Sequence, residues 1–190
     1  MTRPLRLLIL AVLLAAASCS APRNLSFVPK GTVGDVAFIV PCCYIFQPEG
    51  ASRDEALSAL ACDLVSTAIL STRVPVARTI PMTYGDDSPE RTEWMLRLAG
   101  VRPAKASELE VQADLRRAAG DNGYAYGMAT LLLCEARNDG KKYDAECSSV
   151  IFDASTGKVV YYARMRRSRF DPGSYFHVHS LITRMFRNYR

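Results

Sequence analysis

The sequence has few of the residues and motifs that carry enzyme chemistry. Its 190 residues include one tryptophan and two histidines. The chain has no Gly-x-Ser-x-Gly elbow, phosphate-binding loop or His-Glu-x-x-His zinc motif. Beyond the first 18 residues, no apolar run is long enough to cross a bilayer. The sequence therefore gives no ground to predict an enzyme, a cofactor or a bound metal. With 49% apolar and 23% charged residues, it still has the composition of a globular protein.

The first 18 residues have the pattern of an export signal. Arg3 and Arg6 precede an apolar run from Leu7 to Ala17 that is short for a membrane span. Removing residues 1–18 takes away two arginines and lowers the formal net charge from +5 to +3. So small an excess of positive charge does not predict nucleic-acid binding, which depends on many contacts between basic side chains and phosphates. We predict a protein that acts after export and binds no nucleic acid.

The end of this signal, from Leu13 to Ser20, resembles a bacterial lipobox, with small residues directly before Cys19. The resemblance implies that Cys19 is the lipidated first residue of the mature chain, anchored in a membrane by two or three acyl chains. Ser20 is similar to the sorting signal for the outer membrane, which would place the protein on its periplasmic face. Ordinary cleavage after Ala17, with Ala15 as the second small residue, is the alternative.

The rest of the chain is predicted to be a lipidated N-terminus and tether over residues 19–33, followed by one α+β domain over residues 34–190. The near-continuous apolar run Val36–Phe46 predicts a covered strand. A capping box at Ser52–Glu55 predicts the start of a helix, and β-branched residues up to Ile80 predict a second strand parallel to the first.

Two more helices are predicted next, at 88–99 and at 107–119, where Ser107–Glu110 has the form of a second capping box. Three strands follow, at 124–136, 143–152 and 159–167, with turn residues between them. An amphipathic helix from Val178 to Tyr189 ends the chain. The predicted order is β-α-β-α-α-β-β-β-α, an α+β sandwich whose mixed sheet includes a three-stranded antiparallel meander.

Three stretches resemble one group of envelope proteins: Val36–Pro41, Gly123–Ala129 and Phe152–Val160. The group comprises the N-terminal domain of the Tol–Pal translocation protein, the curli secretion channel lipoprotein, the Pel-polysaccharide secretion lipoprotein and the lipoprotein activators of peptidoglycan synthases. The resemblance implies a shared α/β domain without catalytic residues. It also implies envelope protein partners and, because several members form rings, a homo-oligomer.

The cysteines allow several arrangements. If the hairpin loop is Asp139–Lys142, Cys134 lies directly opposite Cys147 and a cross-strand disulfide is predicted, which a shift of one residue would abolish. Cys62 could meet Cys42 or Cys43 across the helix and first strand. Buried thiols are the alternative to any bridge. The adjacent cysteines lack the spacing of a zinc knuckle.

Basic residues are concentrated near the C-terminus. Residues 123–190 carry 11 basic and 6 acidic side chains, against 11 and 13 in residues 19–122. Six arginines form the candidate surface for an anionic partner: Arg164, Arg166, Arg167, Arg169, Arg184 and Arg187. If the last helix packs beside the last strand, they would share one surface for lipid phosphates or an anionic glycan. The alternative is a set of solvated charges that protects a sheet edge.

We compare three hypotheses for the function. The first is a non-enzymatic lipoprotein that acts as an interaction or assembly module in envelope biogenesis or polymer secretion. The second is a periplasmic module that binds an anionic glycan or lipid head group through the arginines. The third is an enzyme with a thiol at Cys42, Cys43 or Cys62. His177 and His179, two residues apart on a predicted helix, point to different sides and are interpreted as surface or packing residues.

Overall fold

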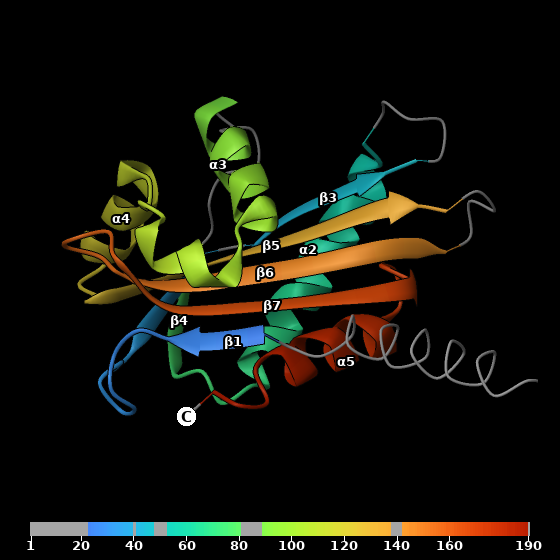
Figure 1. The fold of residues 1–190 in the computed structure, drawn as a ribbon. Helices are drawn as coiled ribbons and strands as arrows, with labels where there is room; N and C mark the ends of the chain where they lie inside the picture. Colours follow the sequence, from blue (N-terminus) through green and yellow to red (C-terminus); the bar gives the residue numbers. More distant parts are fainter. Residues whose placement is uncertain (1–22, 40, 48–52, 81–88, 138–141, 190) are drawn as a thin grey trace, which may run out of the picture.

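The computed structural model describes residues 23–39, 41–47, 53–80, 89–137 and 142–189. Its centre is a seven-stranded mixed sheet in the order β1-β7-β6-β5-β2-β4, with β3 also paired to β5 (Figure 1). The strands are β1 (Arg23–Ser26), β2 (Val36–Ile39), β3 (Cys42–Phe46), β4 (Val76–Ile80), β5 (Tyr126–Ala136), β6 (Tyr143–Asp153) and β7 (Val159–Phe170).

Helices cover both faces of this sheet. They are α2 (Glu55–Leu70), α3 (Pro89–Gly100), the 3-10 helix η1 (Pro103–Glu108), α4 (Ala113–Gly120) and α5 (Tyr175–Met185). One buried core joins α2 and α5 to one face, and a second joins α3, η1 and α4 to the other. None of the helices in the described part of the chain has the length and apolar character needed to span a membrane.

The strands alternate between these two cores along their length. On β5, Met128 and Leu132 face α2, whereas Ala129 and Leu131 face α3 and α4. Because both faces are covered, the strand is apolar from Met128 to Cys134 except for Thr130. The predicted α+β sandwich is confirmed, including the parallel pairing of β2 with β4 and the antiparallel meander β5-β6-β7.

The predicted first strand is divided in two. β2 and β3 both pair with β5, but six steps along the chain from Val36 to Cys42 match only five from Tyr126 to Leu131. Pro41 lies in this break, where its missing N–H group removes one ladder hydrogen bond. A proline inside an apolar run therefore marked a strand boundary that the apolar run alone did not show.

Residues predicted to form a tether also enter the sheet. Arg23–Ser26 form the edge strand β1, antiparallel to β7, with Leu25 opposite Tyr162. The Phe27 N–H group donates to the Val160 carbonyl and extends this pairing. Four residues without an apolar pattern gave no strand signal, because the stabilisation comes from backbone hydrogen bonds to a neighbouring strand.

Neither predicted capping box lies at the start of an α-helix as expected. Helix α2 begins two residues after the expected Ser52, with Asp54 as the N-cap and its carboxylate accepting a hydrogen bond from the Leu57 N–H group at 2.9 Å. Ser52 itself lies outside the described residues. The second box at Ser107 falls in η1, and the α-helix starts only at Ala113. Pro103 starts the earlier 3-10 turn, so the local sequence supports two short helices instead of one.

Candidate functional site

The strand β1 shows from which side the N-terminal segment joins the fold. The export signal (residues 1–18) and Cys19 lie outside the described residues. Arg23, where the description begins, pairs with Arg164 near the middle of β7. Because the two strands are antiparallel, Arg23 is the residue of β1 that lies nearest the side on which β7 ends and α5 begins (Figure 1). We call this side, residues 165–176, the β7–α5 end.

The sheet separates the arginines that were predicted to share one surface. Arg164 and Arg166 lie on the α3 face of β7, in alternation with Met165, which belongs to the α2–α5 core. Arg167 lies on the opposite face and donates to the Ser180 hydroxyl of α5 at 3.2 Å. The single cationic surface is therefore wrong, because successive residues of a strand point to opposite faces.

The positive charges of Arg164 and Arg166, on the α3 face, are largely neutralised by Glu146. Glu146 of β6 forms an ion pair with Arg164 at 2.6 Å and accepts a hydrogen bond from Arg166 at 2.6 Å, which makes it the centre of a three-residue ion cluster. Arg164 is mostly buried and also donates to the Val101 carbonyl at 3.1 Å, whereas Arg166 is exposed. This arrangement fixes Arg164 as a structural residue. A partner could reach only Arg166.

A shallow groove of about 420 Å³ lies beside this cluster, over the part of the sheet that α3 leaves uncovered. Its lining includes Leu133 and Glu135 of β5, Asp144 and Glu146 of β6, and Arg166 of β7. Three acidic side chains and two arginines, Arg166 and Arg167, line the groove, so it lacks the excess of basic side chains that favours an anionic ligand.

The remaining predicted arginines lie apart from this groove. Arg169 is exposed near the end of β7, Arg184 is exposed in the last turn of α5, and Arg187 is exposed beyond that helix. Because α5 starts at the β7–α5 end, Arg184 lies one helix length away from it. The charges are thus spread along the protein, as expected for solvated residues.

Exposed aromatic residues at the β7–α5 end were missed by the sequence analysis. Tyr175 and Phe176, in the first turn of α5, are 52% and 72% exposed. The exposed Leu60 of α2 lies close to Gly173, which comes two residues before Tyr175. Phe176 falls outside the helical stripe of Val178, Leu181 and Met185. The position of Phe176 outside this stripe could have identified it from the sequence. A large apolar side chain that lies off the buried face of a helix must face solvent or a partner.

The strand register contradicts the predicted disulfide between Cys134 and Cys147. Cys134 pairs with Ala145, and Cys147 pairs with Leu132, so the two cysteines are diagonal neighbours on one face. Both remain thiols. The hairpin pairs Ala136 with Tyr143, and the Arg137 N–H group donates to the Lys142 carbonyl, so the turn lies one residue earlier than predicted. Diagonal positions about 7–8 Å apart exceed the reach of a disulfide.

Four cysteine side chains nevertheless lie in the same core, between α2 and the sheet. They are Cys43 of β3, Cys62 of α2, Cys134 of β5 and Cys147 of β6. Burial raises the pKa of the thiols of Cys43, Cys134 and Cys147 well above the usual value. Within the described ranges, no group of three cysteine, histidine or acidic side chains could hold a metal ion. Because their pKa values are raised, the thiols of Cys43, Cys134 and Cys147 are protonated and poorly nucleophilic in the folded protein.

The two histidines have structural contacts. The Nδ1 atom of His177 accepts a hydrogen bond from the Asp171 N–H group at 2.9 Å and so holds the turn before α5. The Nε2 atom of His179 lies 3.1 Å from the Ser71 hydroxyl and links α5 to the end of α2. This agrees with the interpretation of both as surface or packing residues.

Comparison with known proteins gives only distant structural likenesses. No family model matches the sequence, and no curated protein matches it. Among solved structures, a PelC dodecamer from Paraburkholderia phytofirmans is 15% identical, with 87% of this chain and 94% of that chain covered and a TM-score of 0.47. The LpoB C-terminal domain from Salmonella enterica is 12% identical over 72% of this chain and 84% of that chain, with a TM-score of 0.38. Scores below 0.5 establish neither a family nor a function.

Proposed function

We propose that the protein is a non-enzymatic lipoprotein of the bacterial envelope, anchored through Cys19, whose domain lies with its β7–α5 end toward the membrane. The direction of β1 is the observation on which this orientation rests. We further propose that the anchor is in the outer membrane, on its periplasmic face. There the domain would act as an interaction or assembly module.

The distance from the anchor to the domain supports this orientation. Only three residues separate Cys19 from Arg23. At about 3.5 Å per residue, an extended chain between these two positions reaches about 14 Å. A domain on so short a connection stays close to the bilayer surface. The side from which β1 is entered is then the side that faces the lipid.

The exposed residues on that side suit a membrane interface. Phe176 and Tyr175 offer aromatic rings of the kind that accumulate at the level of lipid head groups. The exposed Arg169 precedes them in sequence and would lie near lipid phosphates. Because lipid chains already provide the anchor, these contacts would orient the domain on the membrane.

The proposed lack of catalysis is supported by how the reactive groups are used. The histidines hold α5 in place, and the thiols of Cys43, Cys134 and Cys147 are buried with raised pKa values. The resemblance of three sequence stretches to secretion and cell-wall lipoproteins supports a role in the assembly of envelope components. Self-association stays a prediction, since the structure describes one chain.

The anchor is tested by membrane fractionation. We expect the full protein to remain with membranes after a carbonate wash, and its N-terminal peptide to carry acyl chains on Cys19. Cys19→Ala should move the protein to the soluble fraction. Retention of the Cys19→Ala protein after the wash, or a mature N-terminus without acyl chains, would contradict the anchor.

The orientation is tested separately, with the exported Cys19→Ala protein and vesicles of phosphatidylethanolamine and phosphatidylglycerol. We expect a small fraction to float with the vesicles, and Tyr175→Ser combined with Phe176→Ser to reduce it severalfold. Leu96→Ser is the matched control, because Leu96 is 43% exposed on α3, which covers the opposite face of the sheet from α5. Equal flotation of the double variant and the control would reject this orientation.

A further inference from the structure

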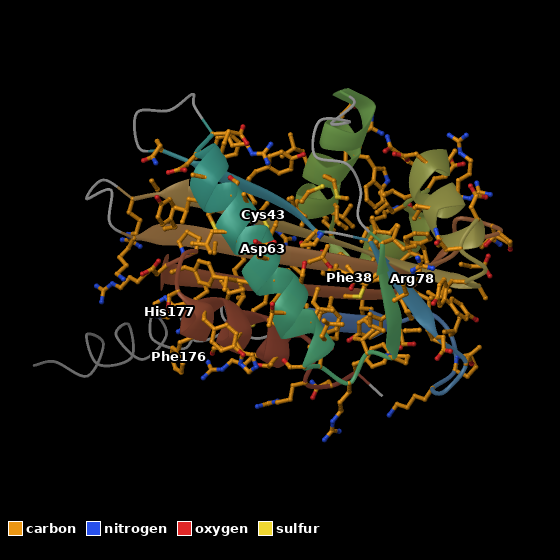
Figure 2. The ribbon with its side chains drawn as sticks, turned by 180° about the vertical axis from the view of Figure 1, so that it is seen from behind. Phe38, Cys43, Asp63, Arg78, Phe176 and His177 are labelled. Carbon is orange, nitrogen blue, oxygen red and sulfur yellow. The ribbon has the colours of Figure 1, made fainter. Side chains whose placement is uncertain are left out.

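The buried cysteines include one pair whose side chains touch. Cys43 of β3 and Cys62 of α2 are 0% and 2% exposed, and their thiols share a hydrogen bond. The Cys62 thiol also donates to the Pro41 carbonyl at 3.0 Å, which holds it against the start of β3. Figure 2 shows Cys43 beside α2, which crosses this face of the sheet. These two thiols therefore face each other from two packed elements.

The other buried cysteines lack this arrangement. Cys134 and Cys147 are diagonal on neighbouring strands, where the backbone sets their separation. Cys42 precedes Cys43 on a strand, and it packs against the α3–α4 core on the opposite face of the sheet. Successive strand residues point apart, so Cys42 and Cys62 lie on different sides of β3. Of the two adjacent cysteines of β3, the fold thus places only Cys43 on the side of Cys62.

We infer that Cys43 and Cys62 form a disulfide bond when the chain folds in the presence of a thiol oxidant. A helix can shift or rotate slightly against a sheet. A pair between a helix and a strand can therefore reach disulfide geometry more readily than two residues fixed in one ladder. The bond would join α2 to the strand that it covers.

The reaction must precede complete burial. In the folded protein, burial raises the pKa of the Cys43 thiol and removes the thiolate that exchange requires. In the unfolded chain, one thiolate attacks the disulfide of the oxidant and forms a mixed disulfide. The second thiolate then displaces the sulfur of the oxidant. Two electrons pass to the oxidant, which is reduced to thiols, and two protons leave the cysteines overall.

The pairing itself is a property of the fold, but its formation in the cell rests on the proposed export to an oxidising compartment. The experiment therefore has two arms. In the first, the purified full chain is denatured, reduced, and refolded with reduced and oxidised glutathione. In the second, the protein is taken directly from the cell envelope. In both arms, remaining thiols are alkylated in denaturant before digestion with trypsin.

Trypsin separates the relevant cysteines, with Cys43 in peptide 31–53, Cys62 in 54–73, Cys134 in 118–137 and Cys147 in 143–158. We expect 31–53 joined to 54–73, and the other two peptides alkylated. Cys42→Ser should keep the link and Cys43→Ala should lose it. Peptide 31–53 contains both Cys42 and Cys43. Fragmentation of the linked peptides in the mass spectrometer shows which of the two carries the bond, without any variant.

Full alkylation of all four peptides in the refolded protein would overturn the inference, as would a link from Cys62 to Cys42, Cys134 or Cys147. A link found after refolding but missing from envelope-derived protein would confirm the pairing and instead contradict the proposed location. As a second readout, oxidised protein should unfold at a higher guanidinium concentration than reduced protein. Cys62→Ala should show no such difference.

Discussion

Gly127 of β5 lies directly opposite Phe152 of β6, and the Phe152 ring occupies the space that a side chain at position 127 would need. A Cβ atom built on Gly127 would lie 2.3 Å from Phe152 Cζ and 3.0 Å from Ala119 Cβ. The ring is fully buried in the core that α4 covers. These two residues belong to the stretches Gly123–Ala129 and Phe152–Val160, so one packing contact connects the two stretches.

This contact predicts that Gly127→Ala is destabilising. The added methyl group cannot fit without moving a buried ring, which costs about 1–3 kcal/mol in a packed core. Chemical denaturation should show a lower free energy of unfolding. Gly120→Ala is the control, because no atom lies within 4 Å of a Cβ there. Phe152→Leu combined with Gly127→Ala should lose less than the two single changes added together, and strict additivity would contradict the clash.

The ion cluster predicts different roles for two neighbouring arginines. Arg164→Met leaves the mostly buried Glu146 carboxylate with only the exposed Arg166 as a partner, and should cost about 2–4 kcal/mol. Arg166→Met removes an exposed charge and should cost less than about 1 kcal/mol. Urea denaturation of the two variants measures this difference. Equal losses would show that the two contacts contribute alike.

The N-cap of α2 gives a third prediction. Asp54→Ala removes the carboxylate that accepts from the Leu57 N–H group, and should lower stability by about 1 kcal/mol. Asp63→Ala serves as control because Asp63 is an exposed residue of the same helix (Figure 2). The thermal midpoint should fall for the first variant and stay nearly unchanged for the second. A midpoint unaffected by Asp54→Ala would show that the cap is not needed.

The turn after β6 predicts a pH dependence. A hydrogen bond from the Ser155 hydroxyl, followed by bonds from the Thr156 backbone and hydroxyl, lowers the pKa of Asp153 below 3.8. A lowered pKa in the folded state stabilises the protein above the unfolded-state value, and this contribution is lost as the pH falls through the folded-state value. Asp153→Asn should therefore be less stable than the original chain at pH 7.

The difference between Asp153→Asn and the original chain should shrink below pH 3.8, as Asp153 becomes protonated, and urea denaturation across this range measures it. Asp121→Asn is the control, because Asp121 is exposed and follows α4. A stability difference for Asp153→Asn that stays constant from pH 7 to pH 2 would contradict the role of the ionised carboxylate.

Periodicity and turn residues were enough to predict the layered fold. The apolar runs identified β5, β6 and β7, and the spacing of Leu181, Ile182 and Met185 identified the buried face of α5. Helix starts were less reliable, because Ser52 and Asp54 are both good capping residues and tertiary contacts decide between them. The strand Arg23–Ser26 could not be predicted, because its pairing partner is distant in the sequence.

The candidate site was harder to predict than the fold. A hairpin turn one residue earlier than expected shifted the pairing by two residues and moved Cys134 away from Cys147. Grouping the arginines failed because sequence proximity on a strand does not mean a shared face, as Arg166 and Arg167 show. The contact between Cys43 and Cys62 was among the alternatives, since a covered strand and the helix above it must share a core.

The pairing of β1 with β7 also constrains when the sheet can be completed. A ribosome makes the residues of β1 long before those of β7. In a nascent chain, β1 therefore has no pairing partner until β7 has emerged. A C-terminal truncation that removes β7 should leave β1 without its neighbour, so a premature stop would damage both ends of the molecule at once.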